Sequence, residues 1–333
     1  MNHRSLTLIV AAALSLPAMA AQGAGFYDGK TVTLMVPSGL GASMGLYGRL
    51  VANGMEKYMP GKGNIIVVSR PGAGGTKGTS YAYNAGPADG SFIAMISAGN
   101  VTIPVLRKMK YDPTKFQWLG SITPRSSVIW LWHTSPVKKL DQAKKIQVII
   151  GSTGKGSGTT IWPMLMNSLI GTKFKIIQGY KGGAAINKAA EQGEVFGRWS
   201  SYSGLTASKK QWLQSGKVRV IAQFGPYIDA EKQAPNFHDL VSGDDRKIVE
   251  FMELSERVGL ALWVRPGVPK DRLDILRKAF KDAMTDPDVI AGAKRRGAPI
   301  NYVSGPALGK MVANAYKITD AQKVRLRKLL GIK

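Results

Sequence analysis

The chain has 333 residues, of which 44% are hydrophobic and 20% are charged, and its formal net charge is +25. This length predicts about two domains with cores that need no disulfide or structural metal. The absence of cysteine excludes a disulfide framework, thiolate catalysis and cysteine-bound metal or iron–sulfur sites. The basic residues are scattered, which favours a solvated basic surface over nucleic-acid binding and is compatible with an anionic ligand.

The first residues have the pattern of a secretory signal peptide. Arg4 provides a positive n-region, residues 6–16 form an apolar h-region, and Ala18-Met19-Ala20 matches an A-x-A cleavage site. The apolar run is too short to span a bilayer. We therefore predict that residues 1–20 are a signal peptide, cleaved after Ala20, and that the mature protein is exported.

Strands and helices are expected to alternate after the signal peptide, with short glycine-rich loops between them. This alternation predicts a parallel sheet with helices on its faces. The expected elements of the first half are a strand at Thr31–Val36, a loop at 37–43, a helix with Leu46, Leu50 and Met55 on one face, and strands at Ile65–Val68 and Ser91–Ser97.

The same pattern restarts in the second half of the chain, which indicates a second α/β unit. Residues 229–247 are polar and are expected to form a long surface connection. The expected elements are strands at Val128–His133, Gln147–Ile150, Lys175–Gln178 and Val218–Gln223, a helix from about Ile161, and two closing helices, one at Asp271–Thr285 and one from about Pro306.

Two strand–loop–helix units, at residues 31–50 and 146–168, are the main site signals. Loop amides and a helix N-terminus offer unpaired N–H groups and a positive dipole end, which suit a carboxylate or a phosphate. The alternative is that the glycines only permit tight turns, but two such loops facing each other would form a clamp. The hydroxyls that can add donors are those of Ser38, Ser43, Ser152, Thr153 and Ser157.

Nucleotide-binding motifs are not matched by the second loop. Lys155 is followed by Gly156 where a Walker A motif needs Ser or Thr. Thr159 occupies the position of the third glycine of a G-x-G-x-x-G motif. The sequence therefore argues against a nucleotide, and we expect no cofactor.

One enzyme motif does match, because Gly41-Ala42-Ser43-Met44-Gly45 is a G-x-S-x-G between a strand and a helix. A secreted serine hydrolase using Ser43 would need an acid and a histidine, for which Asp229 and His238 can be nominated. The motif follows the first strand of the mature chain, whereas such elbows normally follow several strands. We therefore predict that the protein is not an enzyme and keep the hydrolase as an alternative.

Metal catalysis has little support, since His133 and His238 are the histidines left after cleavage and no H-E-x-x-H motif occurs. His133, which ends a predicted strand, can hydrogen-bond an anion in a cleft or lie at the surface. Trp130 and Trp132 share one strand face and are expected in the core. If that face borders the cleft, their rings can stack on an aromatic or apolar ligand.

Arg198, beside Trp199, is placed at the end of a possible strand from Glu194. Its guanidinium can bind a carboxylate through two parallel hydrogen bonds. The alternative is that it lies at the surface or in an ion pair. Both residues are candidate ligand contacts.

Short motifs in a fixed order give the mature chain a resemblance to the periplasmic receptors of tripartite tricarboxylate transporters, also called Bug-type receptors. Each motif is weak alone, and their succession carries the resemblance. They are the strand ending in Pro37 with its loop and Arg49 after it, Arg70-Pro71-Gly72-Ala73-Gly74-Gly75, Pro87-Ala88-Asp89-Gly90, Tyr111-Asp112-Pro113, the loop from Gly151 to Ser157, Tyr180-Lys181-Gly182-Gly183, Gly193-Glu194-Val195, Ser215-Gly216-Lys217-Val218-Arg219 and Pro266-Gly267-Val268-Pro269.

The resemblance implies an α/β fold of the periplasmic-binding-protein (Venus flytrap) type, with a ligand cleft between two domains. The first domain would hold residues 25–123 and 254–333, and the second residues 124–253. In the family the loops after the first strand of each domain hold a ligand carboxylate. Carried onto this chain, the ligand-binding residues of these two loops are Ser38, Gly39, Leu40, Gly41, Ala42, Ser43, Ser152, Thr153, Gly154, Gly156 and Ser157. Three further candidates are Ser97, Asn100 and Tyr180.

The function that the resemblance implies is capture of a small organic anion, a carboxylate, in the periplasm for membrane transporter subunits. We expect a monomer. Many relatives have an aspartate where this chain has Gly45, so an amino-acid ligand is not expected. The alternatives to transport are a receptor that signals through a partner and a basic surface-binding protein, besides the hydrolase.

Overall fold

The computed structural model describes residues 25–41, 43–61 and 63–332, without the side chains of Ser43 and Ala207. The predicted signal peptide and its cleavage site lie outside the described residues. Ala42 of the first predicted loop also lies outside them.

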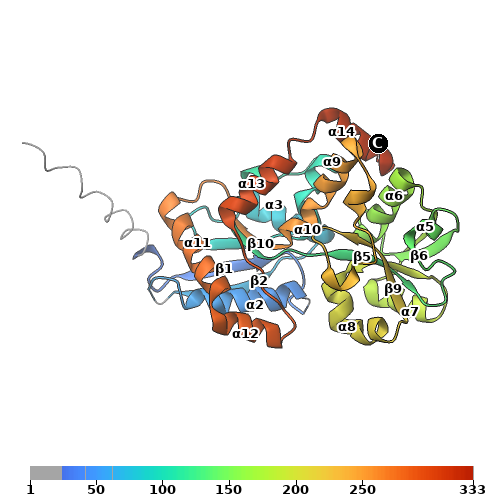
Figure 1. Ribbon diagram of the computed structural model, residues 1–333. Helices are drawn as coiled ribbons and strands as arrows, with labels where there is room; N and C mark the ends of the chain where they lie inside the picture. The colour runs from blue at the N-terminus through green and yellow to red at the C-terminus, as the bar shows by residue number, and fades with distance from the viewer. Residues whose placement is uncertain (1–24, 42, 62, 333) are drawn as a thin grey trace, which may run out of the picture.

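Two β-sheets, one in each lobe of the molecule, organise the described residues (Figure 1). The first sheet has the order β11-β4-β10-β3-β1-β2 and the second β7-β6-β8-β5-β9. The strands of the first sheet are β1 (Thr31–Val36), β2 (Asn64–Ser69), β3 (Phe92–Met95), β4 (Gln117–Thr123), β10 (Leu260–Val264) and β11 (Val303–Ser304). Those of the second are β5 (Ser127–Trp132), β6 (Val148–Ser152), β7 (Phe174–Gln178), β8 (Gly197–Ser201) and β9 (Val218–Phe224).

Helices cover both faces of the first sheet. One face packs on α2 (Ser43–Glu56), α11 (Lys270–Thr285) and α12 (Pro287–Arg295). The other packs on α3 (Thr76–Asn84), α10 (Leu254–Val258) and α13 (Gly305–Ala315). Short 3₁₀ helices join these and later elements: η1 (Ala73–Gly75), η2 (Ala98–Val101), η3 (Pro113–Lys115), η4 (Asp229–Glu231) and η5 (Phe237–Leu240).

The second sheet is covered in the same way. One face packs on α4 (Ile103–Leu106), α5 (Leu140–Ala143), α6 (Gly158–Ile170), α9 (Gly243–Met252) and α14 (Asp320–Leu329). The other packs on α7 (Gly183–Glu191) and α8 (Tyr202–Gln214), where Trp130, Trp132 and Trp212 are buried together. The prediction that Trp130 and Trp132 lie in the core is therefore confirmed.

The last helix differs from its predicted placement. Residues 254–333 were assigned to the first domain, but α14 contacts α4, α6 and α9, and Leu326 and Leu330 belong to the core built on the second sheet. Figure 1 shows α14 beside α9 and α6. Hydrophobic periodicity identifies the buried face of a helix but not the sheet that buries it, which explains the difference.

Most predicted strands are confirmed within two residues of their bounds, but some elements were missed. Leu260–Val264 is buried at every position, so it lacks the alternation that marks a strand. The helix expected from Ile161 begins at Gly158, because Ser157 accepts a hydrogen bond from the Thr159 amide and caps it. The strand expected from Glu194 begins at Gly197, and α9 begins within the predicted polar connection.

The carboxyl ends of the parallel strands in the two sheets face each other across the boundary between the lobes. β1, β2, β3 and β4 run in one direction, and β10 runs against them. In the second sheet β6, β7, β8 and β9 share a direction, and β5 opposes them. The chain crosses between the sheets at residues 124–126, where the Arg125 amide donates to the Glu256 carbonyl at 2.7 Å and ties this crossing to α10. Ligands in open α/β sheets bind at such strand ends.

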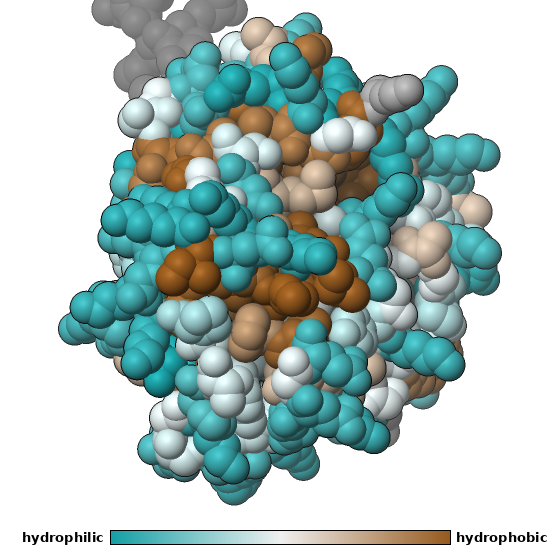
Figure 2. Space-filling view, turned by 90° about the vertical axis from the view of Figure 1, so that its right-hand side faces the viewer, coloured by the Kyte–Doolittle hydropathy of each residue, from teal (hydrophilic) through white to brown (hydrophobic). Residues whose placement is uncertain are grey.

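Figure 2 shows hydrophilic side chains around a central group of apolar ones on the face it presents. Among the helices of the described ranges, none combines the length and the apolar character needed to cross a membrane.

Candidate functional site

A cavity of ≈ 210 Å³ lies between the two sheets, at the strand ends described above. It is walled by elements of both lobes and by the crossing segment. The residues that line it are Ala98, Gly99, Thr102, Ile103, Leu106, Arg125, Ser127, Gly156, Gly158, Ile161, Trp162, Trp199, Ser201, Met252, Ser255 and Glu256.

Arg125 is the cation of this cavity. It is the single basic residue among the described residues that line it. Its guanidinium forms no hydrogen bond or ion pair with any described residue. Arg125 and Ser201 also line a second cavity of ≈ 460 Å³. Tyr47 of α2 and residues 202–204 and 206 of α8 help to enclose it. An unpaired guanidinium facing two cavities is a ready partner for an anion, because it presents several donors in one plane.

Glu256 is the single acidic residue among those same lining residues. It is buried, and the Ser127 hydroxyl donates a hydrogen bond to its Oε2 at 2.9 Å. Burial raises the pKa of Glu256 to about 7, although the charge of Arg125 and the Ser127 hydrogen bond oppose this rise. Burial therefore favours the neutral form of this carboxyl group more than in an exposed glutamate.

The second predicted loop lines the cavity through its backbone. Gly156 and Gly158 belong to the wall, and the hydroxyls of the loop bond to one another. Ser152 is fully buried, lies 2.9 Å from the Thr159 hydroxyl, and accepts from the Gly154 amide at 3.1 Å. Thr153 donates to the Ser157 hydroxyl at 2.9 Å. These hydroxyls, predicted as donors to a ligand, hold the loop in shape.

Trp199 and Arg198 project from opposite faces of β8, as neighbouring strand residues do. Trp199 faces the cavity and packs so closely on Gly158 that a Cβ there would lie 2.7 Å from the indole ring. Arg198 faces away, and its Nε donates to the Asn187 Oδ1 on α7 at 2.9 Å. Burial lowers the pKa of Arg198 to about 10. The prediction that Arg198 faces the cleft is therefore corrected, because alternation along β8 turns Trp199 toward the cavity and Arg198 toward α7.

The first predicted loop is held by contacts within the first lobe. The Ser69 hydroxyl donates to the Ser38 carbonyl at 2.8 Å, and Arg49 donates to the Leu40 carbonyl at 3.2 Å. Of the described residues 38–41, which include the candidates Gly39 and Gly41, none lines the cavity. Ala42 and the Ser43 side chain lie outside the described residues.

The end of β3 reaches the cavity beside two predicted residues. Ala98 and Gly99 line it, between the candidates Ser97 and Asn100. Asn100 is buried, and its Nδ2 donates to the Thr79 hydroxyl at 3.1 Å. Asn100 thus fastens η2 to α3 and positions the Ala98–Gly99 backbone.

Two further candidates lie away from the cavity. His133 is exposed at the carboxyl end of β5, and β5 runs from the cleft toward the opposite edge of its sheet. The prediction that His133 enters the cleft is wrong for this topological reason. Tyr180 packs against the core beside α7, and its hydroxyl donates to Glu194 at 3.4 Å.

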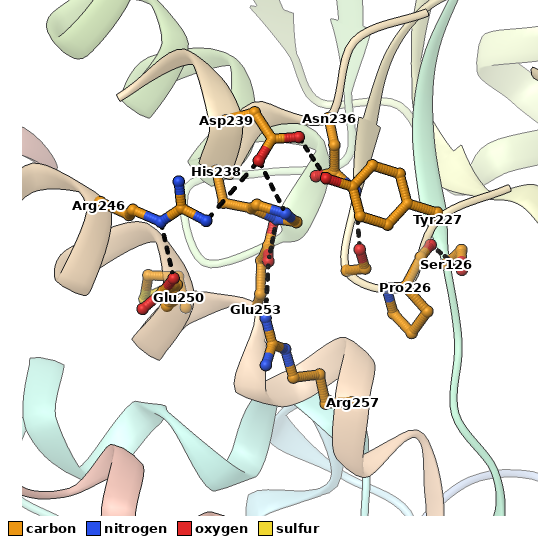
Figure 3. A network of polar contacts seen from close by, with 12 residues as sticks. Ser126, Pro226, Tyr227, Asn236, His238, Asp239, Arg246, Glu250, Glu253 and Arg257 are labelled. Atoms are coloured by element: carbon orange, nitrogen blue, oxygen red, sulfur yellow. Dashed lines mark hydrogen bonds and ion pairs between the residues drawn. The ribbon is translucent and has the colours of Figure 1, made fainter. Parts of the chain in front are cut away.

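His238, nominated for the hydrolase alternative, belongs to a buried polar network (Figure 3). Its Nδ1 lies 2.9 Å from Glu253 Oε2 and its Nε2 lies 3.4 Å from Asp239 Oδ1. The hydrogen bond with Glu253 raises the pKa of His238. Asp229 is exposed and forms no hydrogen bond or ion pair with His238. His238 therefore pairs with acids other than the one nominated.

Within the described part of the chain, no group of three or more His, Asp or Glu side chains is placed so that it could hold a metal ion.

Sequence reasoning missed the charged pair of the cavity, Arg125 and Glu256, because neither lies in a glycine-rich loop. Both lie within three residues of the predicted domain boundaries at 123/124 and 253/254. Chain crossings border an interdomain cleft, so charged residues at these boundaries were the signal that could have found them.

One family model matches most of the chain. Residues 48–321 match the model of the tripartite tricarboxylate transporter family receptor. A UPF0065 protein of Agrobacterium vitis is 26% identical over 299 residues, which covers 87% of this chain and 81% of that relative.

The solved structures that resemble the chain have the same two-domain fold. A TctC solute-binding protein from Polaromonas has a TM-score of 0.68 at 21% identity, covering 92% of this chain and 99% of that chain. A Rhodopseudomonas palustris protein with bound malate has a TM-score of 0.64 at 20% identity, covering 90% and 98%. Another, with adipate, also has a TM-score of 0.64 at 20% identity, covering 91% and 98%.

Proposed function

Because the chain belongs to the tripartite tricarboxylate transporter receptor family, whose members are solute-binding receptors and not enzymes, we propose that it captures a small organic carboxylate for the membrane subunits of such a transporter. The observation that carries the proposal is the unpaired guanidinium of Arg125 in the cavity between the lobes. The predicted signal peptide supports a periplasmic location for the mature receptor.

The cavity supports a small ligand with one anionic end. Its volume of ≈ 210 Å³ is below the range of about 300–1,000 Å³ typical of pockets for drug-sized molecules. Arg125 would hold a carboxylate of the ligand, and Trp199, Ile161 and Leu106 would contact its carbon chain. Relatives of the same fold with malate and with adipate support this ligand class.

Closure of the two lobes on the ligand would complete the site. Arg125 and Ser127 lie at the crossing, whereas Gly99 and Gly156 approach from opposite lobes. A ligand that contacts both lobes shifts the population toward the closed form, to the extent that it binds that form better. We propose that the closed form is the one that docks on the transporter.

Thermal-shift and calorimetric titration of the mature protein with acetate, benzoate, malate, adipate and citrate, at two salt concentrations, test the proposal. A ligand at 100 times its Kd adds about 2.7 kcal/mol of stability and visibly raises the Tm. We expect Arg125→Gln to weaken binding at least tenfold. The matched control is Arg295→Gln, which removes the same charge from an exposed residue of α12, away from the cavity, and leaves affinity unchanged.

Two outcomes contradict the proposal in different ways. If none of the acids raises the Tm, the carboxylate ligand is wrong. The second outcome is that many anions bind with equal affinity, that this affinity falls as the salt concentration rises, and that Arg125→Gln does not change it. The chain would then be a basic surface-binding protein instead.

A further inference from the structure

The cavity that would receive an anion already contains a carboxyl group, Glu256. We propose that Glu256 takes up one proton when the organic anion enters, and that the neutral carboxyl then donates a hydrogen bond to the anion. This inference rests on the proposed function and specifies how its site accepts a negative charge.

The position of Glu256 leaves part of its carboxyl group free for a ligand. It stands on α10, in the cavity wall, and Ser127 donates to its Oε2 at 2.9 Å. No described residue forms a hydrogen bond with its Oε1. No basic side chain of the described residues lies within ion-pair distance of the Glu256 carboxyl group. Glu256 is thus a buried carboxyl group without a salt bridge, beside the space for the ligand.

The charged groups around Glu256 come from two elements. Arg125 on the crossing favours its ionised form, and Glu253 at the start of α10 disfavours it. Glu253 is itself paired, with His238 Nδ1 at 2.9 Å and with Arg257 Nη2 at 3.8 Å (Figure 3). The cavity residues from η2, α4, α6 and β8 are all uncharged. Arg125 is therefore the single cation that Glu256 and a ligand would share.

An entering anion changes this balance. With Glu256 ionised, its charge offsets that of Arg125, and the ligand meets a site with no net attraction. When two negative charges share a buried site, one of them is strongly favoured to bind a proton. Burial already places the pKa of Glu256 at about 7 without a ligand, so the anion raises it further. Protonation leaves Arg125 to the ligand.

Protonation also changes the hydrogen bonding. An ionised carboxylate can only accept hydrogen bonds, whereas a neutral carboxyl group has an O–H to donate. The neutral form can accept from Ser127 and donate to a ligand oxygen at once. The carboxyl group then contributes to binding the anion that it would otherwise repel.

Calorimetric titration at pH 8, in buffers with low and high ionisation enthalpies, tests the proposal. The ligands are whichever of malate, adipate and benzoate bind, because all are fully ionised at this pH. We expect the wild-type protein to take up about one proton per ligand. Its affinity should fall about tenfold per pH unit between pH 8 and 9 and be nearly constant below pH 6.5.

Two substitutions identify the group that takes up the proton. Glu256→Gln keeps a neutral donor, so it should bind with the low-pH affinity at every pH and without proton uptake. Glu250→Gln removes a partly exposed carboxylate of α9, bonded to Arg246, and should retain the wild-type uptake.

The outcomes separate the two proposals. Binding without proton uptake by the wild-type protein, or uptake that persists in Glu256→Gln, overturns this inference and leaves the receptor function standing. The wild-type proton count needs no variant, so a poorly folding variant would not prevent the test. Failure of every acid to bind overturns both proposals.

Discussion

Arg125 and Glu256 show how the environment of single residues determines the chemistry of this cleft. Both line the same small cavity, yet neither is neutralised by the other through a salt bridge. Arginine keeps its charge in almost any environment, whereas burial moves the pKa of a carboxyl group toward neutrality. The cavity thus holds one fixed positive charge and one negative charge that depends on pH.

His238 gives a prediction at the residue scale. Its pKa is raised by the hydrogen bond with Glu253, so its contribution to stability is complete below the unfolded pKa of about 6.5 and is lost as pH rises through the folded pKa. We expect His238→Gln to lower the free energy of unfolding by about 1 kcal/mol at pH 6 and by less at pH 8.5.

Urea unfolding of both proteins between pH 5.5 and 9 measures this difference. The contribution of Glu256 to the free energy of unfolding also falls as pH rises. It is present in both the wild type and His238→Gln, so it cancels in the difference between them. A difference between them that does not change with pH would show that the buried His238 stays neutral.

The start of α6 shows how an element shapes the cavity. Ser157 caps the helix, and Gly158 allows the indole of Trp199 to lie directly against the first turn. At Gly158 the helix therefore presents backbone to the cavity, and the side chains of Ile161 and Trp162 line it one turn later. The capping residue is visible in the sequence, but the contact with Trp199 joins residues 41 positions apart and is not.

Gly158→Ala tests this element. The added Cβ would lie 2.7 Å from the Trp199 ring, so the ring or the first turn of α6 must move. We expect a destabilisation of about 1–3 kcal/mol and an affinity for carboxylates that falls by roughly tenfold. Calorimetry gives the affinity, and denaturant unfolding gives the stability.

Gly156→Ala is its matched control. Gly156 lines the same cavity, and a Cβ there meets nothing within 4 Å. Affinity should stay within about twofold of the wild type, since no atom has to move. Equal losses in both variants would mean that the loop, and not the Trp199 contact, governs binding.

At the scale of the whole molecule, α14 joins the end of the chain to the second lobe. Leu326 is fully buried among core residues of the second sheet, and Arg325 holds Asp245 of α9 with two hydrogen bonds, at 2.6 and 2.9 Å. We therefore propose that the second domain comprises residues 124–253 together with α14. The crossing at 124–126, the junction at α10 and the segment before α14 would move together on closure.

Leu326→Ala tests the role of α14. Removing a fully buried leucine side chain leaves a cavity and costs about 2–5 kcal/mol of the free energy of unfolding. Val324→Ala, two residues away at a side chain that is 58% exposed, should change it by less than about 0.5 kcal/mol. Urea unfolding compares the two, and equal small effects would mean that α14 is not part of the core.

Local patterns in the sequence determined the α/β class, most strand positions and the glycine-rich second loop. Strand periodicity, glycine turns and caps act over a few residues, so they can be read without the fold. The ordered short motifs from Pro37 to Pro269 also identified the family, which the match over residues 48–321 confirms.

Tertiary structure alone decided which side chains meet in the cavity. His133 and Arg198 were both placed on predicted strands. His133 lies far from the cavity because β5 runs away from the cleft, and Arg198 projects from the face of β8 opposite the cavity. Arg125 and Glu256 are 131 positions apart and meet because the crossing at 124–126 hydrogen-bonds to α10. Strand direction, facing and chain crossings follow from how the whole chain packs, and no local stretch of sequence encodes them.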